Sequence, residues 1–144
     1  MKRALTAACL ALAACDAYAF AWDSSSGILI IGFVNGGTSI GVVVEAPDTV
    51  AAGVAFDVTV NTFGSSSCVR AERLDVEVSG AVARLTPYDR VAPPNSVCTA
   101  DLGAHPHTAS VTFPSPGPAT LEVLGRTESG DTVVRKAVVV KQDR

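Results

Sequence analysis

The chain has 144 residues with 11 basic and 14 acidic side chains, which gives a formal net charge of −3 at pH 7. Such an acidic chain lacks the basic surface that recognition of nucleic-acid phosphates or of an anionic membrane surface requires, so we expect neither mode of binding. The length suffices for one domain with its own hydrophobic core.

The first predicted element is an export signal. Lys2 and Arg3 precede an apolar run over 4–14, and a basic start, a short apolar core and small residues before a cut site are typical of secretory signals. The run is too short to span a bilayer core of about 30 Å, which needs about 20 residues. It ends in Leu12-Ala13-Ala14-Cys15, which resembles the lipobox of bacterial lipoproteins.

This resemblance implies a diacylglyceryl group on the thiol of Cys15 and cleavage just before it. The chain then divides into a signal peptide over 1–14, a lipidated tether over 15–27 and a domain over 28–144. The domain would face the extracytoplasmic side of the bacterial cell envelope, anchored to the inner or outer membrane. Removal of the two basic residues of the signal takes the formal net charge from −3 to −5, so attachment would rest on the acyl chains, of which two or more anchor a protein stably.

Ordinary secretion is the alternative. Ala17-Tyr18-Ala19 is a small-x-small cut site, and cleavage there would release a soluble domain that begins at Phe20. The lipoprotein interpretation is favoured because the apolar core of the signal runs directly into the lipobox.

Strand patterns follow the tether. Two apolar runs over 28–34 and 39–45 flank Asn-Gly-Gly at 35–37, which predicts a β-hairpin. Farther along, apolar and polar residues alternate with the period of two that marks half-buried strands. The expected core residues are Phe56, Val58, Val60, Leu74, Val76, Val78, Val111, Phe113, Leu121 and Val123. About seven short strands separated by polar turns predict an all-β fold, an antiparallel β-sandwich.

Two segments carry a family resemblance. The residues over 46–60, with Pro, Val, Gly and Phe in this order, resemble the opening strands of bacterial immunoglobulin-like domains, and those over 116–123 resemble a late strand of the same fold. The resemblance covers 45–141 and implies an immunoglobulin-like sandwich. The chain departs from antibody domains because its only tryptophan, Trp22, lies in the tether.

The cysteines fit an exported protein. Cys9 would leave with the signal and Cys15 would carry the lipid, so Cys68 and Cys98 remain as an even pair in an oxidising compartment. We expect them to form a disulfide, with two free thiols as the alternative. The strand directions place both at the same end of the sandwich, where the long segment over 88–107 would form a candidate binding surface.

Exposed residues at that end are the candidate ligand-binding groups: Arg70, Arg73, Tyr88 and Arg90. Arginine and tyrosine are enriched at interfaces, although a charged loop in water would have the same composition. His105 and His107 are interpreted as two surface histidines because no carboxylate cluster completes a metal site around them. No cofactor, metal or catalytic motif is expected.

Two functions therefore remain. The first is a binding or adhesion module that recognises a protein or glycan through the loops held by the disulfide. The second is a structural accessory subunit of an envelope complex, joined to it by edge-strand pairing. We do not expect an enzyme.

Overall fold

The computed structural model describes residues 22–34 and 41–142, so the predicted export signal and Cys15 lie outside it. Within these ranges the secondary structure is nine strands and one short 3₁₀ helix. In chain order the elements are η1 (Ser24–Ser26), β1 (Ile28–Ile31), β2 (Val44–Glu45), β3 (Thr49–Ala51), β4 (Phe56–Gly64), β5 (Val69–Ser79), β6 (Val82–Val91), β7 (Gly103–Val111), β8 (Gly117–Thr127) and β9 (Gly130–Lys141). No helix in the described part of the chain is long and apolar enough to cross a membrane.

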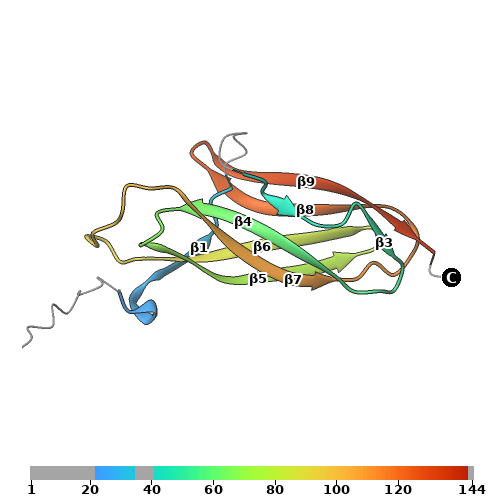
Figure 1. Ribbon diagram of the computed structural model, residues 1–144, viewed down its shortest axis with the longest axis horizontal. Helices are drawn as coiled ribbons and strands as arrows, with labels where there is room; N and C mark the ends of the chain where they lie inside the picture. Colours follow the sequence, from blue (N-terminus) through green and yellow to red (C-terminus); the bar gives the residue numbers. More distant parts are fainter. Residues whose placement is uncertain (1–21, 35–40, 143–144) are drawn as a thin grey trace, which may run out of the picture.

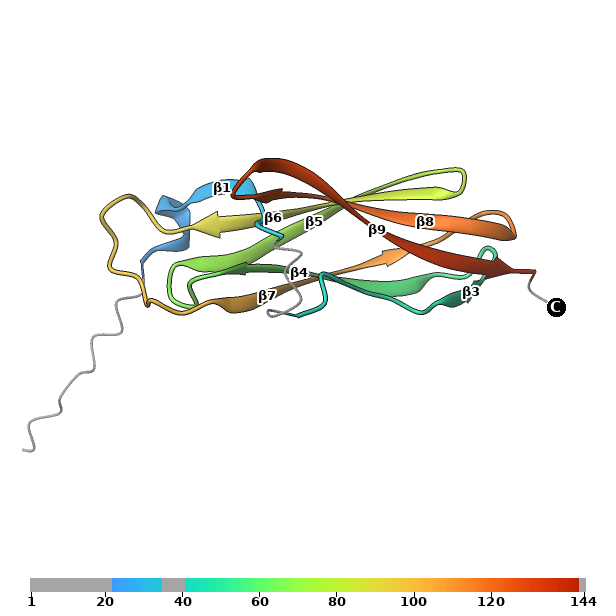
Figure 2. The ribbon, with the colours of Figure 1, turned by 90° about the horizontal axis from the view of Figure 1, so that it is seen from above.

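The strands form two sheets that pack face to face (Figure 1). In the larger sheet β5 lies on one side of β6, while β8 and β1 share its other side, and β9 and β3 follow beyond β8. The smaller sheet has the order β2-β4-β7. Figure 2 shows the two layers from above, and both views show a molecule elongated along its strands, with turns and loops gathered at its two ends.

Alternation along the strands produces the core. In β4, Val58 and Val60 are fully buried whereas Asp57 is exposed, and burying one large apolar side chain stabilises the fold by about 1.5–3 kcal/mol. The predicted core residues that are fully buried are Val58, Val60, Val111, Phe113, Leu121 and Val123. Those partly buried against them are Phe56, Leu74 and Val76. The prediction is wrong for Val78, which is 39% exposed because it lies at the tip of the β5–β6 hairpin, beside the exposed Gly80 turn.

The predicted all-β sandwich is confirmed, with nine strands instead of about seven. Most neighbouring strands are antiparallel, as expected. Two pairings are parallel: β6 with β8, and β3 with β9. The immunoglobulin-like strand arrangement stays a prediction.

The predicted hairpin around 35–37 is wrong. β1 pairs with β6, where Ile31 lies opposite Tyr88, whereas β2 pairs with β4. The turn residues themselves lie outside the described part of the chain. The pairing of β1 with β6 has its cause in β8, because β6 pairs with β8 only over 82–85. The second half of β6 therefore needs another partner for its backbone groups, and β1 supplies it.

The chain continues from β1 into an extended segment over 32–34 that enters the space between β6 and β8. The Gly32 N–H donates to the Pro87 carbonyl (2.9 Å), and the Val34 N–H donates to the Arg126 carbonyl (2.8 Å). Val34 is fully buried against Gly125, where an added Cβ would lie 2.1 Å from the valine side chain. The N-terminal segment is therefore an integral part of the core.

Candidate functional site

The predicted disulfide is present at one end of the sandwich. Cys68 and Cys98 are bonded, with their Cα atoms 5.5 Å apart. The bond holds the segment over 92–102, between β6 and β7, against the short loop over 65–68 that precedes β5. We call 92–102 the pinned loop, and the end of the molecule that carries it the disulfide end.

Hydrogen bonds reinforce this covalent link. The Thr99 N–H donates to Ser67 Oγ (2.8 Å), and the Ser66 N–H donates to Asp101 Oδ1 (3.1 Å). The Thr99 hydroxyl also donates to the Asp101 carboxylate. Hydrogen bonds from Ser66 and Thr99 lower the pKa of Asp101 from 3.8 to about 2. The aspartate is therefore ionised at neutral pH, and it orders the pinned loop as an acceptor.

The tether docks at the same end. Trp22 Nε1 donates to the Ser67 carbonyl (3.0 Å), and the Arg70 guanidinium lies 4.5 Å from the centre of the Trp22 ring. The Gly27 carbonyl accepts from Arg90 Nη1 (3.2 Å). A Cβ at Gly27 would lie 2.4 Å from the Trp22 ring, so only glycine allows this close packing. The chain thus enters the domain at the disulfide end.

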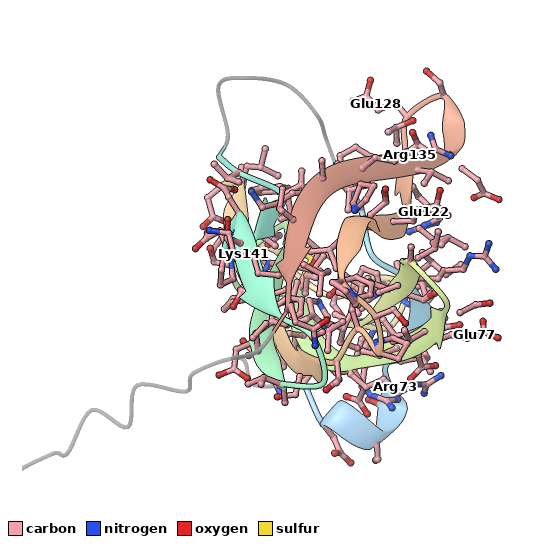
Figure 3. All side chains as sticks on the ribbon, turned by 90° about the vertical axis from the view of Figure 1, so that its right-hand side faces the viewer. Arg73, Glu77, Glu122, Glu128, Arg135 and Lys141 are labelled. Atoms are coloured by element: carbon pink, nitrogen blue, oxygen red, sulfur yellow. A yellow bond between two sulfur atoms is a disulfide. The ribbon has the colours of Figure 1, made fainter. Side chains whose placement is uncertain are left out.

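The structure brings the four predicted ligand-binding residues together on β5 and β6. Arg70 lies opposite Arg90, and Arg73 lies opposite Tyr88 across a β-bulge. We call these four residues the arginine cluster. Figure 3 labels Arg73, which projects from the outer face of the larger sheet.

Each arginine of the cluster already has a partner within the protein. The Arg73 guanidinium lies 4.2 Å from the centre of the Tyr88 ring, and Arg90 makes a two-point contact with Glu72 at 2.7 and 3.1 Å. The hydrogen bond from Arg90 lowers the pKa of Glu72, and Glu72 in turn raises the pKa of Arg90. Two members of the cluster contact the tether, Arg70 at the Trp22 ring and Arg90 at the Gly27 carbonyl.

A second group of polar residues lies buried between the sheets. Thr62, Asp89 and His107 are at most 4% exposed. His107 Nε2 lies 2.9 Å from Asp89 Oδ1, and the Thr62 hydroxyl donates to the same oxygen at 2.9 Å. The Nδ1 atom of His107 lies 3.1 Å from the Arg73 carbonyl oxygen. The network therefore joins β4, β5, β6 and β7, and so links both sheets.

The hydrogen-bond partners of His107 indicate which ring nitrogen carries a hydrogen. A carbonyl oxygen only accepts, so Nδ1 must carry a hydrogen toward Arg73. Nε2 faces Oδ1 of the Asp89 carboxyl. Thr62 and Asp89 meet the imidazole at the same nitrogen, whereas a catalytic triad uses both. The network is a structural link between the sheets.

The alternation along β4 and β7 is a sequence signal for this network. Continuing the alternation of β4 by one step places Thr62 inward, and continuing that of β7 backward from Val111 places His107 inward. The interpretation as two surface histidines is wrong for His107, because β7 begins at Gly103 and carries it into the core. His105 is partly buried, with Nε2 3.4 Å from the Gly64 carbonyl.

Opposite charges also alternate across the outer face of the larger sheet. The register places Glu77 opposite Arg84, Arg84 opposite Glu122, and Glu122 opposite Arg135. Glu122 Oε1 lies 2.9 Å from Arg135 Nε, and Glu122 Oε2 lies 3.9 Å from Arg84 Nη2. Figure 3 shows Glu77, Glu122 and Arg135 along one side of the molecule. We call these four residues the charge ladder.

An open hollow of about 400 Å³ lies on this face. Glu77, Arg84 and Glu122 line it together with Ser79 and Val82. The hollow is near the end opposite the disulfide, since the lining from β5 and β6 adjoins the turn of their hairpin. It is a polar surface with fixed charge positions.

No group of three or more histidine, cysteine, aspartate or glutamate side chains in the described residues is placed to hold a metal ion. Comparisons with protein-family models, with curated proteins and with solved structures gave no match for this chain.

Proposed function

We propose that this protein is a lipid-anchored envelope protein in which an immunoglobulin-like sandwich serves as a binding module. Cys15 carries the lipid, and the domain is displayed on the extracytoplasmic side of a bacterial membrane. The observation that supports this proposal is the docked tether. Trp22 and Gly27 are fixed at the disulfide end, so an anchor at Cys15 would give the domain a defined orientation.

That orientation favours a particular binding surface. The disulfide end would lie next to the membrane, and the hollow with its charge ladder would lie away from it. The arginine cluster is a less suitable ligand site, because its side chains are engaged with Trp22, Glu72 and one another. An alternating row of charges gives a partner a specific register, which favours a protein that presents the complementary row.

The anchor is tested first. Cys15→Ser should abolish partitioning of the protein into membranes and the lipid-modified mass of the N-terminal peptide. Mature chains that begin at Phe20, or a Cys15→Ser variant that still partitions, would contradict the lipoprotein proposal.

The binding surface is tested by charge reversal. Arg84 has a 53% exposed side chain, so Arg84→Glu should leave the fold intact. It would place three acidic residues side by side in the ladder and should abolish co-purification of the partner from solubilised membranes. Lys141→Glu, at the end of β9, is the matched control and should keep the partner. Retention of the partner by both variants would exclude the ladder.

A second candidate function, a structural accessory joined by strand pairing, is favoured by the edge of β9. β3 pairs with β9 only at 139–141, and no other strand in the described ranges lies along that side. The Val139 N–H donates to the Asp48 carbonyl (2.9 Å) on this side, so Val133, Arg135 and Ala137, which share its alternation, direct their backbone groups the same way.

The edge can be blocked without changing the ladder. Val133→Pro removes an N–H that points away from β8, a position where a strand tolerates proline. Loss of the partner from Val133→Pro, with retention in Arg84→Glu, would support the accessory function. The reverse result would support the binding module.

A further inference from the structure

We propose that the pinned loop is a second contact with the bilayer, in which Val97 and Leu102 rest on the lipid surface. This inference rests on the proposed lipidation of Cys15. It concerns a part of the molecule that the proposed binding face leaves unused. The occupant of the loop would be lipid and not a protein.

The tether limits how far the disulfide end can lie from the membrane. Trp22 is seven positions after Cys15, and a fully extended chain of seven steps spans at most about 25 Å. Trp22 is hydrogen-bonded to the carbonyl of Ser67, the neighbour of Cys68. An anchor at Cys15 therefore holds the disulfide end within that distance of the membrane.

The surface at the disulfide end carries exposed aliphatic side chains. Val97 is 79% exposed, the highest fraction among the exposed large hydrophobic residues described, and Leu102 is 51% exposed. Both belong to the pinned loop. Ile28, at the start of β1, is 52% exposed. In Figures 1 and 2 the pinned loop protrudes at the same end as η1 and β1. Exposed aliphatic side chains gain from burial in the acyl boundary of a membrane.

The backbone of the pinned loop is held rigid by its cross-links. The disulfide, the Thr99–Ser67 hydrogen bond and the Ser66–Asp101 hydrogen bond fix the backbone of the loop between Val97 and Leu102. The loop therefore presents its aliphatic residues at a low cost in conformational entropy. A weak contact suffices, because the anchor turns docking into an intramolecular event with a high effective concentration.

Charge at this end favours an apolar contact over an electrostatic one. Asp23, Glu72 and Asp101 balance the nearby arginines Arg70 and Arg90, so the end carries no excess of positive charge. Phosphatidylcholine vesicles, which are zwitterionic, are therefore the appropriate probe.

The experiment compares two exposed valines at opposite ends of the lipidated full-length protein. Val97→Trp places a fluorophore on the pinned loop, and Val139→Trp places one on β9, where the valine is 52% exposed. Each variant also contains Trp22, so the difference between them reports the new position. The proteins are reconstituted in phosphatidylcholine vesicles with brominated acyl chains, which quench tryptophan only in contact with lipid.

We expect greater quenching of Val97→Trp than of Val139→Trp, with the opposite order for quenching by aqueous acrylamide. Adding Leu102→Asp to Val97→Trp should reduce the lipid quenching. Equal lipid quenching of the two variants would overturn the proposal. So would a Val97→Trp variant shielded from acrylamide but not quenched by lipid, since a protein would then cover the loop. Mass spectrometry of the N-terminal peptide separates these outcomes from a failure of lipidation itself.

Discussion

The buried contact between Asp89 and His107 satisfies polar atoms of both side chains. Their side chains are 2% and 1% exposed, and Nε2 lies 2.9 Å from Oδ1. Loss of one partner removes this contact and leaves the other side chain buried with one polar partner fewer. Breaking a buried pair in this way typically costs more than replacing both groups by apolar ones.

We therefore predict that His107→Leu and Asp89→Leu each lower the free energy of unfolding by about 3–5 kcal/mol. The double variant should be more stable than either single variant, because no unpaired polar group of the pair remains buried. Urea denaturation of the three variants measures this. A double variant whose loss equals the sum of the single losses would show that the two residues act independently.

Asp101 makes the stability of the pinned loop depend on pH. Its pKa is lowered from 3.8 to about 2 by hydrogen bonds from Ser66 and Thr99. A lowered pKa means that the carboxylate stabilises the loop above pH 3.8, and that this contribution is lost as the pH falls through about 2.

As the pH falls from 3.8 to about 2, the protection of the Ser66 amide against hydrogen exchange should decrease. The Phe63 amide, which donates to the Phe33 carbonyl, is the internal control. In Asp101→Asn the Ser66 amide should lose this pH dependence. If its protection changes in the same way in the variant and the parent, Asp101 is not the acceptor responsible.

At the level of strands, the sequence predicted what alternation along one strand determines. The faces of β4, β8 and most of β5 followed directly, because a half-buried strand alternates apolar and polar residues. The pairing of β1 did not follow, since it depends on β6 and β8 diverging after Leu85. That divergence is a long-range property of two strands and leaves no mark within 28–34.

The candidate site was also predictable from the sequence only in part. Cys68 and Cys98 could be paired from sequence because they are the two cysteines outside the predicted signal and lipobox, and strand direction brings them to one end. The juxtaposition of Arg70, Arg73, Tyr88 and Arg90 also followed from the β5–β6 hairpin. Their mutual contacts did not follow, because side-chain partners across a bulge depend on its geometry.

The fit of Val34 against Gly125 can be tested by exchanging volume. Gly125→Ala places a methyl group where an added Cβ would lie 2.1 Å from Val34, and it should destabilise the domain by about 1–3 kcal/mol through overpacking. Val34→Ala in the same chain should restore part of that loss, because it removes the colliding atoms. Urea denaturation checks both. Additive losses would mean that the two side chains do not meet.

For the whole molecule, the disulfide limits the freedom of the unfolded chain. Cys68 and Cys98 are 30 residues apart in sequence, and closing a loop of that size stabilises by about 3–4 kcal/mol in the chain-entropy model. We predict this loss on replacing both cysteines by serine, with the fold retained, as measured by urea denaturation against the oxidised protein. An unchanged midpoint and slope would contradict the prediction.

The insertion of the N-terminal segment between β6 and β8 has a consequence for the order of assembly. Under the proposed export the chain emerges from its N-terminus, so 28–34 would reach the outside first, yet it bonds to Pro87 and Arg126. Those residues arrive much later, and contacts between distant parts of a chain form slowly. In that case β1, the strand nearest the proposed anchor, would stay unpaired and apolar until most of the domain had emerged. We expect its closure to be the last step of folding and the step that most needs protection from aggregation.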